Sequence, residues 1–397
     1  MSILKFNFPA SSPQVFVGSG SQLSKSIDSE KALAILFFVA LALAFWRAPS
    51  VARPRFAAPP APVVSALPAE FASERLPKVA PFSHASTLAE LADGRIALAW
   101  YAGAAEGSTD AEIWFSTRDA SGWSPPRVIA TRADTAAATG TVVRKIGNPV
   151  LHASGSRLDL WYVTVSIGGW SGAAISHKTS DDGGVSWCPA VKLTTSPLFN
   201  MGTLVRTSPV AMRDGGLGLP VYHEMFGQHG EWLRIGPRGR VLAKVRIPGS
   251  ALQPAVAAID GKEALVLARS AEKANGVVMA DSTADGGATW QQVVPPPIAN
   301  DNTSLNLLRL QSGRLLLAAN AIRGRDRSVL QLFLSDDKGA SWKVSRVIED
   351  DPNVNAEYSY PALLQTTDGR IHMTYSYHAK VIAHVTITEA ALLEALH

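Results

Sequence analysis

The stretch Ser180–Trp187 reads SDDGGVSW, and it decides the fold because its pattern returns at 283–290 (TADGGATW) and at 335–342 (SDDKGASW). All three copies fit Ser/Thr-x-Asp-x-Gly-x-Ser/Thr-Trp. Each copy lies between two strand-like runs of residues, a position typical of the tip of a β-hairpin. The short carboxylate can accept hydrogen bonds from its own turn, and the glycine permits a positive φ. The motif is therefore a folding device that says little about function.

A second repeat accompanies the first. Six short turns end in a glycine that precedes an apolar strand, at positions 94, 155, 215, 261, 313 and 369, with intervals of 46 to 61 residues. This period predicts a repeat architecture. We expect residues 81–397 to form an all-β, six-bladed β-propeller of four-stranded blades, because radial closure leaves few open strand edges. The strand at 384–387 is expected to complete a blade shared with the N-terminal end of the domain.

The residues before the propeller differ in composition. Residues 1–31 are polar, residues 32–47 contain an uninterrupted apolar run from Ala32 to Trp46, and residues 48–80 are rich in proline and alanine. Fifteen apolar residues are few for a membrane-spanning helix, so the run is typical of a signal-peptide core or a marginal signal anchor. A buried core helix is the alternative. We expect residues 48–80 to be an extended linker, and the propeller to be exported or anchored to a membrane through the N-terminal segment.

The charge balance limits the partners. The formal net charge of +4 is carried by residues 1–80, since residues 81–397 contain 29 basic and 29 acidic residues. A neutral body lacks the basic stripe that binding to nucleic acid requires. The single cysteine, Cys188, excludes an intrachain disulfide. Neither a metal-binding nor a phosphate-cradling motif is present, so we expect no cofactor and no metal. The sequence does not indicate the oligomeric state.

The expected topology places one group of residues on a single face. The two inner strands of a blade are antiparallel, so the start of the first and the end of the second lie together at one mouth of the central channel. Charged and aromatic residues gather at these positions, although a solvated charge at the rim is the ordinary alternative for each of them. The strand starts carry His84, Asn148, Ser208, Gln253, Asn306 and Tyr360, and the strand ends and following loops carry Glu106, Asp110, His223, Glu224, Arg269, Arg327 and Tyr377.

Residues 81–387 resemble the sialidase-type propellers with Asp-boxes, and are most similar to their divergent, BNR-repeat-like branch. The resemblance implies that Arg269 and Arg327 clamp a substrate carboxylate, for which the planar guanidinium is suited. It further implies that Tyr360 is the catalytic tyrosine and that Asp110 is the acid/base. These four side chains are expected to converge on one pocket.

Two departures from the family pattern stand beside these matches. His84 occupies the position at which the resemblance implies a third arginine, and Gln253 lies near the position of the glutamate that takes the proton of the tyrosine. Because an ordinary tyrosine ionises only near pH 10, its activation requires help. Either Glu224 from the neighbouring loop replaces the missing base, or the mechanism differs. We therefore expect a poor sialidase.

Three functions remain open at this stage. The first is a sialidase-like, exo-acting glycoside hydrolase that acts on an extracytoplasmic glycan, with an acidic sugar other than sialic acid as a candidate. The second is a glycan-binding propeller without catalysis, and the third is an envelope scaffold. In the first, Asp110, Tyr360 and Glu224 are the expected catalytic residues, and the substrate-binding residues are Arg269, Arg327, His84, Gln253, Glu106, Asn148, His223 and Tyr377.

Overall fold

The computed structural model describes residues 23–47, 53–196, 199–249, 251–273 and 275–396. The chain divides into two compact units, residues 1–52 and 53–397. The first unit contains helix α1 (Leu23–Arg47), which includes the apolar run. Over the described residues, no helix combines the length and the apolarity needed to cross a membrane. The greater part of the polar segment expected at 1–31 lies outside the described residues.

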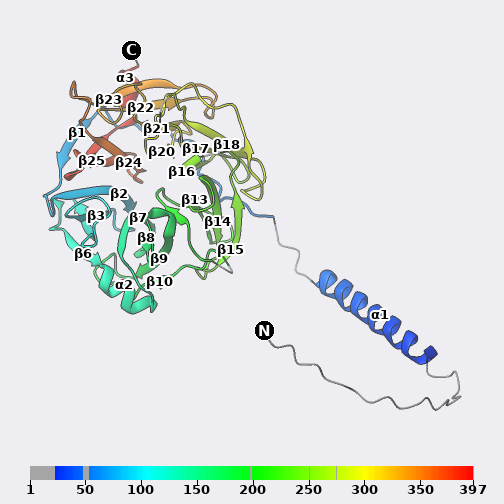
Figure 1. Ribbon diagram of the computed structural model, residues 1–397. Coiled ribbons are helices and arrows are strands. Elements are labelled where there is room, and N and C mark those ends of the chain that lie inside the picture. Colours follow the sequence, from blue (N-terminus) through cyan, green and yellow to red (C-terminus); the bar gives the residue numbers. More distant parts are fainter. Residues whose placement is uncertain (1–22, 48–52, 197–198, 250, 274, 397) are drawn as a thin grey trace, which may run out of the picture. The chain divides into compact units, whose positions relative to one another are not determined.

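The second unit confirms the expected propeller. Its described residues form six antiparallel sheets arranged around a common centre (Figure 1). Two blades have an interrupted strand: β11 and β12 both pair with β13, and β5 and β6 both pair with β4. We number the blades in chain order. Blade one contains β2 (Phe82–Glu90), β3 (Ile96–Gly103), β4 (Glu112–Asp119), β5 (Gly122–Trp123) and β6 (Arg127–Ala130), and blade two contains β7 (Lys145–Ser154), β8 (Arg157–Val165), β9 (Ala173–Ser180) and β10 (Val191–Lys192). Blade three contains β11 (Thr203–Val205), β12 (Val210–Ala211), β13 (Leu217–His223), β14 (His229–Ile235) and β15 (Val241–Arg246), and blade four contains β16 (Ala251–Ala258), β17 (Ala264–Ser270), β18 (Met279–Thr283) and β19 (Gln291–Gln292). Blade five contains β20 (Asn306–Arg309), β21 (Leu315–Ala319), β22 (Val329–Ser335) and β23 (Lys343–Asp350), and blade six contains β24 (Tyr358–Gln365), β25 (Ile371–Tyr377), β26 (Val381–Ile387) and β1 (Phe71–Arg75). Short helices α2 (Arg132–Thr139) and α3 (Glu389–Glu394) and the 3-10 turn η1 (Trp170–Gly172) lie between or after the strands.

The N-terminal part of this unit closes the ring. Strand β1 pairs with β26 from Phe71 opposite Ile387 to Arg75 opposite Ala383, so the last blade is shared with the N-terminal end as expected. The prediction that residues 48–80 form a linker is wrong for residues 53–80, because the second compact unit begins at Arg53. Phe56 is fully buried, with its ring centroid 6.0 Å from that of Trp232. Backbone hydrogen bonds from Phe56 to Gly261 and from Ala57 to Ala211 hold the same segment, and composition alone does not reveal these contacts.

The Asp-boxes connect neighbouring blades. They form the turns after β9, β18 and β22, and a Cβ atom added to the glycine that all three boxes share, the fifth residue of the box, would collide with the preceding blade. The added atom would lie 2.4 Å from the Phe115 ring at Gly184, 2.7 Å from Trp232 at Gly287 and 2.5 Å from Leu265 at Gly339. The glycine is therefore required for the close approach of two blades as well as for its positive φ.

The box carboxylate supports its own turn, and its removal is expected to cost stability. Asp285 accepts from the Thr289 N–H at 2.9 Å and from the Thr289 hydroxyl at 2.7 Å. Asp285→Ala leaves these donors unpaired and is expected to lower the free energy of unfolding by about 1–3 kcal/mol. Chemical denaturation measures this change, with Asp285→Asn as the milder control because its amide retains one acceptor oxygen. A midpoint unchanged in Asp285→Ala would contradict the assigned role.

A buried histidine pair lies where the ring closes. His372 Nδ1 is 3.0 Å from His384 Nε2, and His384 Nδ1 is 2.9 Å from a carboxylate oxygen of Glu74 in β1. Burial, with the neighbouring His384, lowers the pKa of His372 to about 3. The imidazole of His372 is therefore neutral in the folded protein at neutral pH, while the unfolded chain binds a proton near pH 6.5.

Acid is therefore expected to destabilise the closed ring. Because the folded pKa of His372 is depressed, its contribution is complete above about pH 6.5 and is lost as the pH falls from there towards 3. One such group accounts for about 1–2 kcal/mol between pH 7 and pH 5. Unfolding free energies measured across this range should show the slope in the native chain and a flatter curve in His372→Gln. Identical slopes in the two proteins would show that His372 is not the group responsible.

Candidate functional site

A repeated backbone irregularity directs residues towards one end of the central channel. The inner strands β2, β7, β16 and β24 each contain a register shift, and a residue with φ between 42° and 55° lies within it. Such a conformation is strained for residues other than glycine, and strain of this kind concentrates at functional sites. The residues are Ala85, Asn148, Gln253 and Tyr360.

Tyr360, Arg269 and Gln253 meet at this end of the channel. The Nη1 atom of Arg269 lies 3.4 Å from the Tyr360 hydroxyl and 3.3 Å from Oε1 of Gln253. The Nε–H of Arg269 donates to Asn302 at 2.7 Å, which fixes the orientation of the guanidinium. Blades four and six therefore supply one polar cluster, as the alignment of their strand ends predicts.

Arg327 approaches the same tyrosine from blade five. Its guanidinium carbon lies 5.5 Å from the centroid of the Tyr360 ring, and its Nη1 atom is 2.5 Å from a carboxylate oxygen of Glu357. The Ser359 hydroxyl donates to the same oxygen at 2.9 Å. Three of the four side chains expected to converge, Arg269, Arg327 and Tyr360, thus lie together.

His84 also packs against Tyr360. The two ring centroids are 4.2 Å apart, and the imidazole is almost fully buried. Burial and the charges of nearby arginines lower the pKa of His84 well below its usual range. The imidazole is therefore neutral at pH 7, and it cannot replace the positive charge of the arginine that the family resemblance implies at this position.

A hydrogen-bond network extends the cluster towards blade two. The Tyr222 hydroxyl accepts from the Asn148 amide at 3.3 Å and lies 3.5 Å from the Gln253 amide nitrogen. Gln253 therefore spans Tyr222 and Arg269, and it can act as a hydrogen-bonding bridge but not as a base. Glu224 lies in the loop after β13, and burial raises the pKa of its carboxyl against the opposing effect of Arg269. A carboxyl group with a raised pKa beside such a cluster is a candidate proton carrier.

Asp110 lies in the loop between β3 and β4, and it is not among the residues that contact Tyr360. Its side chain is fully exposed, its Oδ2 accepts from the backbone N–H of Ala104 at 3.1 Å, and a hydrogen bond from Ser108 lowers its pKa. Glu106 is exposed in the same loop. The loop follows the end of β3, which pairs with the start of β2 around His84. Its carboxylates are therefore at the expected end of the blade, but the structure gives Asp110 no contact with Arg269, Arg327 or Tyr360.

Two further expected site residues have other neighbours. His223 is buried and stacks on the exposed Phe226, with ring centroids 5.8 Å apart. Tyr377 packs under the guanidinium of Arg75 from β1, at 3.8 Å from the ring centroid, and against Tyr358. The aromatic end of β25 thus contributes to blade closure rather than to the cluster at Tyr360.

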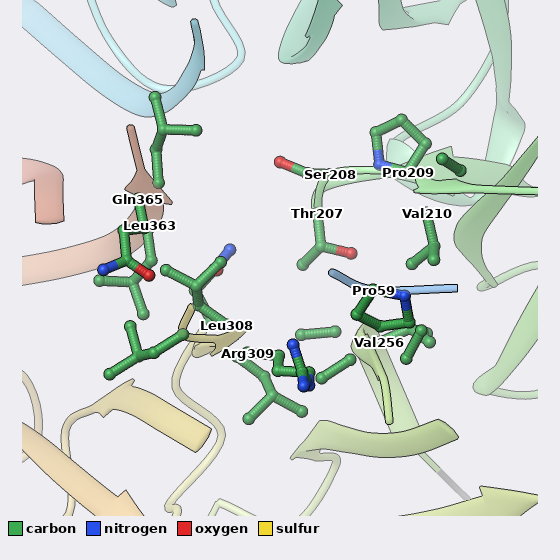
Figure 2. Close-up of a pocket in the computed structure, with 18 of the residues that line it drawn as sticks. Pro59, Thr207, Ser208, Pro209, Val210, Val256, Leu308, Arg309, Leu363 and Gln365 are labelled. Carbon is green, nitrogen blue, oxygen red and sulfur yellow. The ribbon is translucent and has the colours of Figure 1, made fainter. Parts of the chain in front are cut away.

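Hollows open at both ends of the channel. The first has a volume of about 620 Å³ and is lined by Arg269, Asn302, Asp326, Arg327 and Glu357, among others. The second has a volume of about 440 Å³ and lies between the inner strands and the segment around Pro59. Figure 2 shows the second hollow, with Thr207, Val256, Leu308 and Leu363 from four blades around it. Ser208 and Asn306 line this second, largely apolar hollow rather than the first.

Reasoning from the sequence missed several members of the cluster. Asn302 and Glu357 orient the two arginines, and Arg206 lies buried beneath Tyr360. Proline directly follows Asn148, Gln253 and Tyr360, and this recurring pair was the available signal for the strained positions. Within the described part of the chain, no group of three His, Cys, Asp or Glu side chains is placed to hold a metal ion.

Comparisons with known proteins agree with this architecture. The model of the BNR repeat-like domain matches residues 94–373, and the chain therefore belongs to this family of sialidase-like propellers. A search of the curated proteins finds no match.

Solved sialidases share the fold. The Hadza microbial sialidase Hz136 is 15% identical, with a TM-score of 0.66 over 79% of this chain and 66% of that one. The intramolecular trans-sialidase from Ruminococcus gnavus is 14% identical, with a TM-score of 0.62 over 80% of this chain and 97% of that one. The Trypanosoma rangeli sialidase is 14% identical, with a TM-score of 0.63 over 86% of this chain and 60% of that one. At these identities the likeness concerns the fold alone.

Proposed function

We propose that the protein is a sialidase-like glycoside hydrolase whose substrate carries a carboxylate. The observation that carries the proposal is the position of Arg269, whose Nη1 atom lies 3.4 Å from the Tyr360 hydroxyl, with Arg327 on the face of the same ring. Two guanidinium groups line the first hollow and provide a cationic site for an acid, and the phenol of Tyr360, which contacts both groups but does not itself line the hollow, is the nucleophile. The chemistry of this pocket agrees with the enzymes named in the structural matches, which are sialidases and trans-sialidases.

In this proposal Tyr360 attacks the anomeric carbon and a carboxyl group protonates the departing oxygen. Glu224 suits the acid role, because burial keeps its pKa raised, whereas the lowered pKa of the exposed Asp110 favours its ionised form. Asp110 would need to leave its local hydrogen bonds to take part. Gln253 supplies no base, and turnover of sialosides should therefore be slow.

A binding protein without catalysis is the second candidate function, and Gln253 favours it. Gln253 bridges Tyr222 and Arg269 with an amide that donates and accepts hydrogen bonds but transfers no proton. Such a site can hold a sugar acid while it fails to cleave it. A scaffold that uses neither property is the third candidate.

Incubation with aryl glycosides of sialic acid, uronic acids and neutral sugars separates these candidates. The hydrolase is supported by release from an acidic glycoside that exceeds release from the sialoside and is lost in Arg269→Ala. Binding of an acid without release from any glycoside would instead support the second candidate. The absence of both binding and release would contradict the first two candidates. Variants Glu224→Gln and Asp110→Asn then identify the proton carrier, because the true acid variant loses the alkaline limb of the pH profile.

We further propose that the propeller acts outside the cytoplasm, which the apolar run Ala32–Trp46 supports as a signal-peptide core. Expression of the full chain in its host, followed by N-terminal sequencing of the secreted fraction, tests this. Recovery of the uncleaved chain from the cytoplasm alone would contradict it.

A further inference from the structure

Arg206 ties three blades together beneath the candidate site. It lies in the break between β11 and β12, and its side chain crosses to the inner strands of two other blades. The guanidinium donates to the carbonyl oxygens of Ser86 at 3.2 Å, Tyr360 at 2.7 Å and Pro361 at 3.0 Å. Only 2% of the residue is exposed. Two of the three acceptors belong to the bulge that holds Tyr360 at a φ of 55°.

The charge of Arg206 has no carboxylate partner. Across the described residues its hydrogen bonds end on carbonyl oxygens, and its buried Nε remains unpaired. Burial lowers its pKa to about 10, so the group still carries its charge at neutral pH. An unpaired buried cation is unfavourable for folding. The groups that can offset it are tyrosines, and the Arg206 guanidinium carbon lies 5.3 Å from the Tyr360 ring centroid.

The position of this charge complements the departure at His84. The neutral imidazole of His84 packs at a tilt against the Tyr360 ring, where the family resemblance implies an arginine. Arg206 brings a guanidinium to the same ring from blade three, and Arg269 and Arg327 reach it from blades four and five. Three cations thus surround one phenol that has no base beside it. Opposite charges attract more strongly in a buried, partly dry site than in water.

We propose that Arg206 is a positioning residue that holds Tyr360 in its bulge and stabilises negative charge on the phenol oxygen. The phenol proton passes to water, and no base is consumed or regenerated. This inference rests on the proposed function for the role of Tyr360 as the reacting group. A purely structural tie between blades is the competing explanation, and it predicts a loss of stability without an effect on the phenol.

Alkaline titration of tyrosinate absorbance tests the inference without a substrate. The chain has seven tyrosines, so the difference between the native protein and Tyr360→Phe isolates the signal of Tyr360. We expect Arg206→Gln to move the half-point of this signal to higher pH by about one unit or more, which follows from the loss of a unit charge at this distance. Arg234→Gln is the matched control, since Arg234 is a buried arginine that is ion-paired with Asp214. Its half-point for Tyr360 should match that of the native protein.

A half-point unchanged in a folded Arg206→Gln protein, or an equal shift in Arg234→Gln, would overturn the inference. Should Arg206→Gln fail to fold, Arg206→Lys keeps the charge but loses the planar fork. Its half-point should stay within about half a unit of the native value, and a shift of a full unit would show that charge is not the operative property.

The glycoside assay reports separately on the proposed function. If the protein cleaves no glycoside but shows the titration that depends on Arg206, the proposal for Arg206 stands and the proposed hydrolase activity is wrong. Where cleavage is found, Arg206→Gln should lower kcat by about 10- to 100-fold with little change in KM, because the charge acts through Tyr360 and not on the substrate.

Discussion

Tyr360→Phe is expected to lower kcat on the cleaved glycoside by about 10²- to 10⁴-fold, with KM changed by less than about threefold. The Tyr360 hydroxyl lies 3.4 Å from Arg269, and its ring contacts His84 and Arg327, so the lost oxygen is the one that lies beside the Arg269 guanidinium. Removing it leaves the packing of the ring intact. Steady-state kinetics on the glycoside identified from the panel measures the change.

Tyr358 provides the matched control. It lies two residues earlier in the same strand, and its hydroxyl donates to Asp351 at 2.9 Å rather than facing Arg269. Tyr358→Phe should therefore retain turnover within about twofold of the native value. Equal losses in the two variants would indicate damage to blade six, and full activity in Tyr360→Phe would remove the tyrosine from the mechanism.

Gln253→Glu is expected to have the second large effect, as a gain. A carboxylate at this position would lie beside Arg269, whose Nη1 atom is now 3.3 Å from the Gln253 side-chain oxygen and 3.4 Å from the Tyr360 hydroxyl. General-base assistance contributes about 10²- to 10⁴-fold, so turnover of a fluorogenic sialoside should rise by about 10²-fold or more.

The control for this gain is Gln253→Ala, which removes the amide without supplying a base and should give no increase. A double variant, Gln253→Glu with Tyr360→Phe, should lose the gain, because the base then has no phenol to act on. No increase in Gln253→Glu would mean that the missing glutamate does not limit the reaction.

The fold could be predicted from the sequence because repeats fix it. The Asp-box turns and the six glycine turns recur with the period of a blade, and a period is independent of the details of packing. The boundary of the domain was missed because it depends on single contacts. Phe56 docks in the core and β1 pairs with β26, although both lie in a segment with the composition of a spacer.

The site could be predicted only where strand geometry determines it. Arg269, His84, Gln253 and Tyr360 lie near strand starts or ends, and the antiparallel blade brings these ends together with Arg327 from the turn before β22. Side chains on loops depend on local hydrogen bonds instead, and Asp110 is held by Ala104 and Ser108 within its own loop. Arg206 was overlooked because its strand is interrupted at that residue, so a long side chain from blade three reaches blades one and six.

Calorimetric titration of sugar acids against their methyl esters tests most directly whether Arg269, Arg327 and Tyr360 form a carboxylate site. N-acetylneuraminic acid and glucuronic acid are each compared with the ester, in the native protein, in Arg269→Ala and in Arg325→Ala. Arg325 is the control because it pairs with Asp350 at the end of β23. At least one acid should bind about tenfold or more tightly than its ester, as the loss of a charge-assisted contact requires. This preference should vanish in Arg269→Ala and persist in Arg325→Ala. Equal binding of acid and ester by the native protein, or a preference that survives in Arg269→Ala, would contradict the carboxylate site.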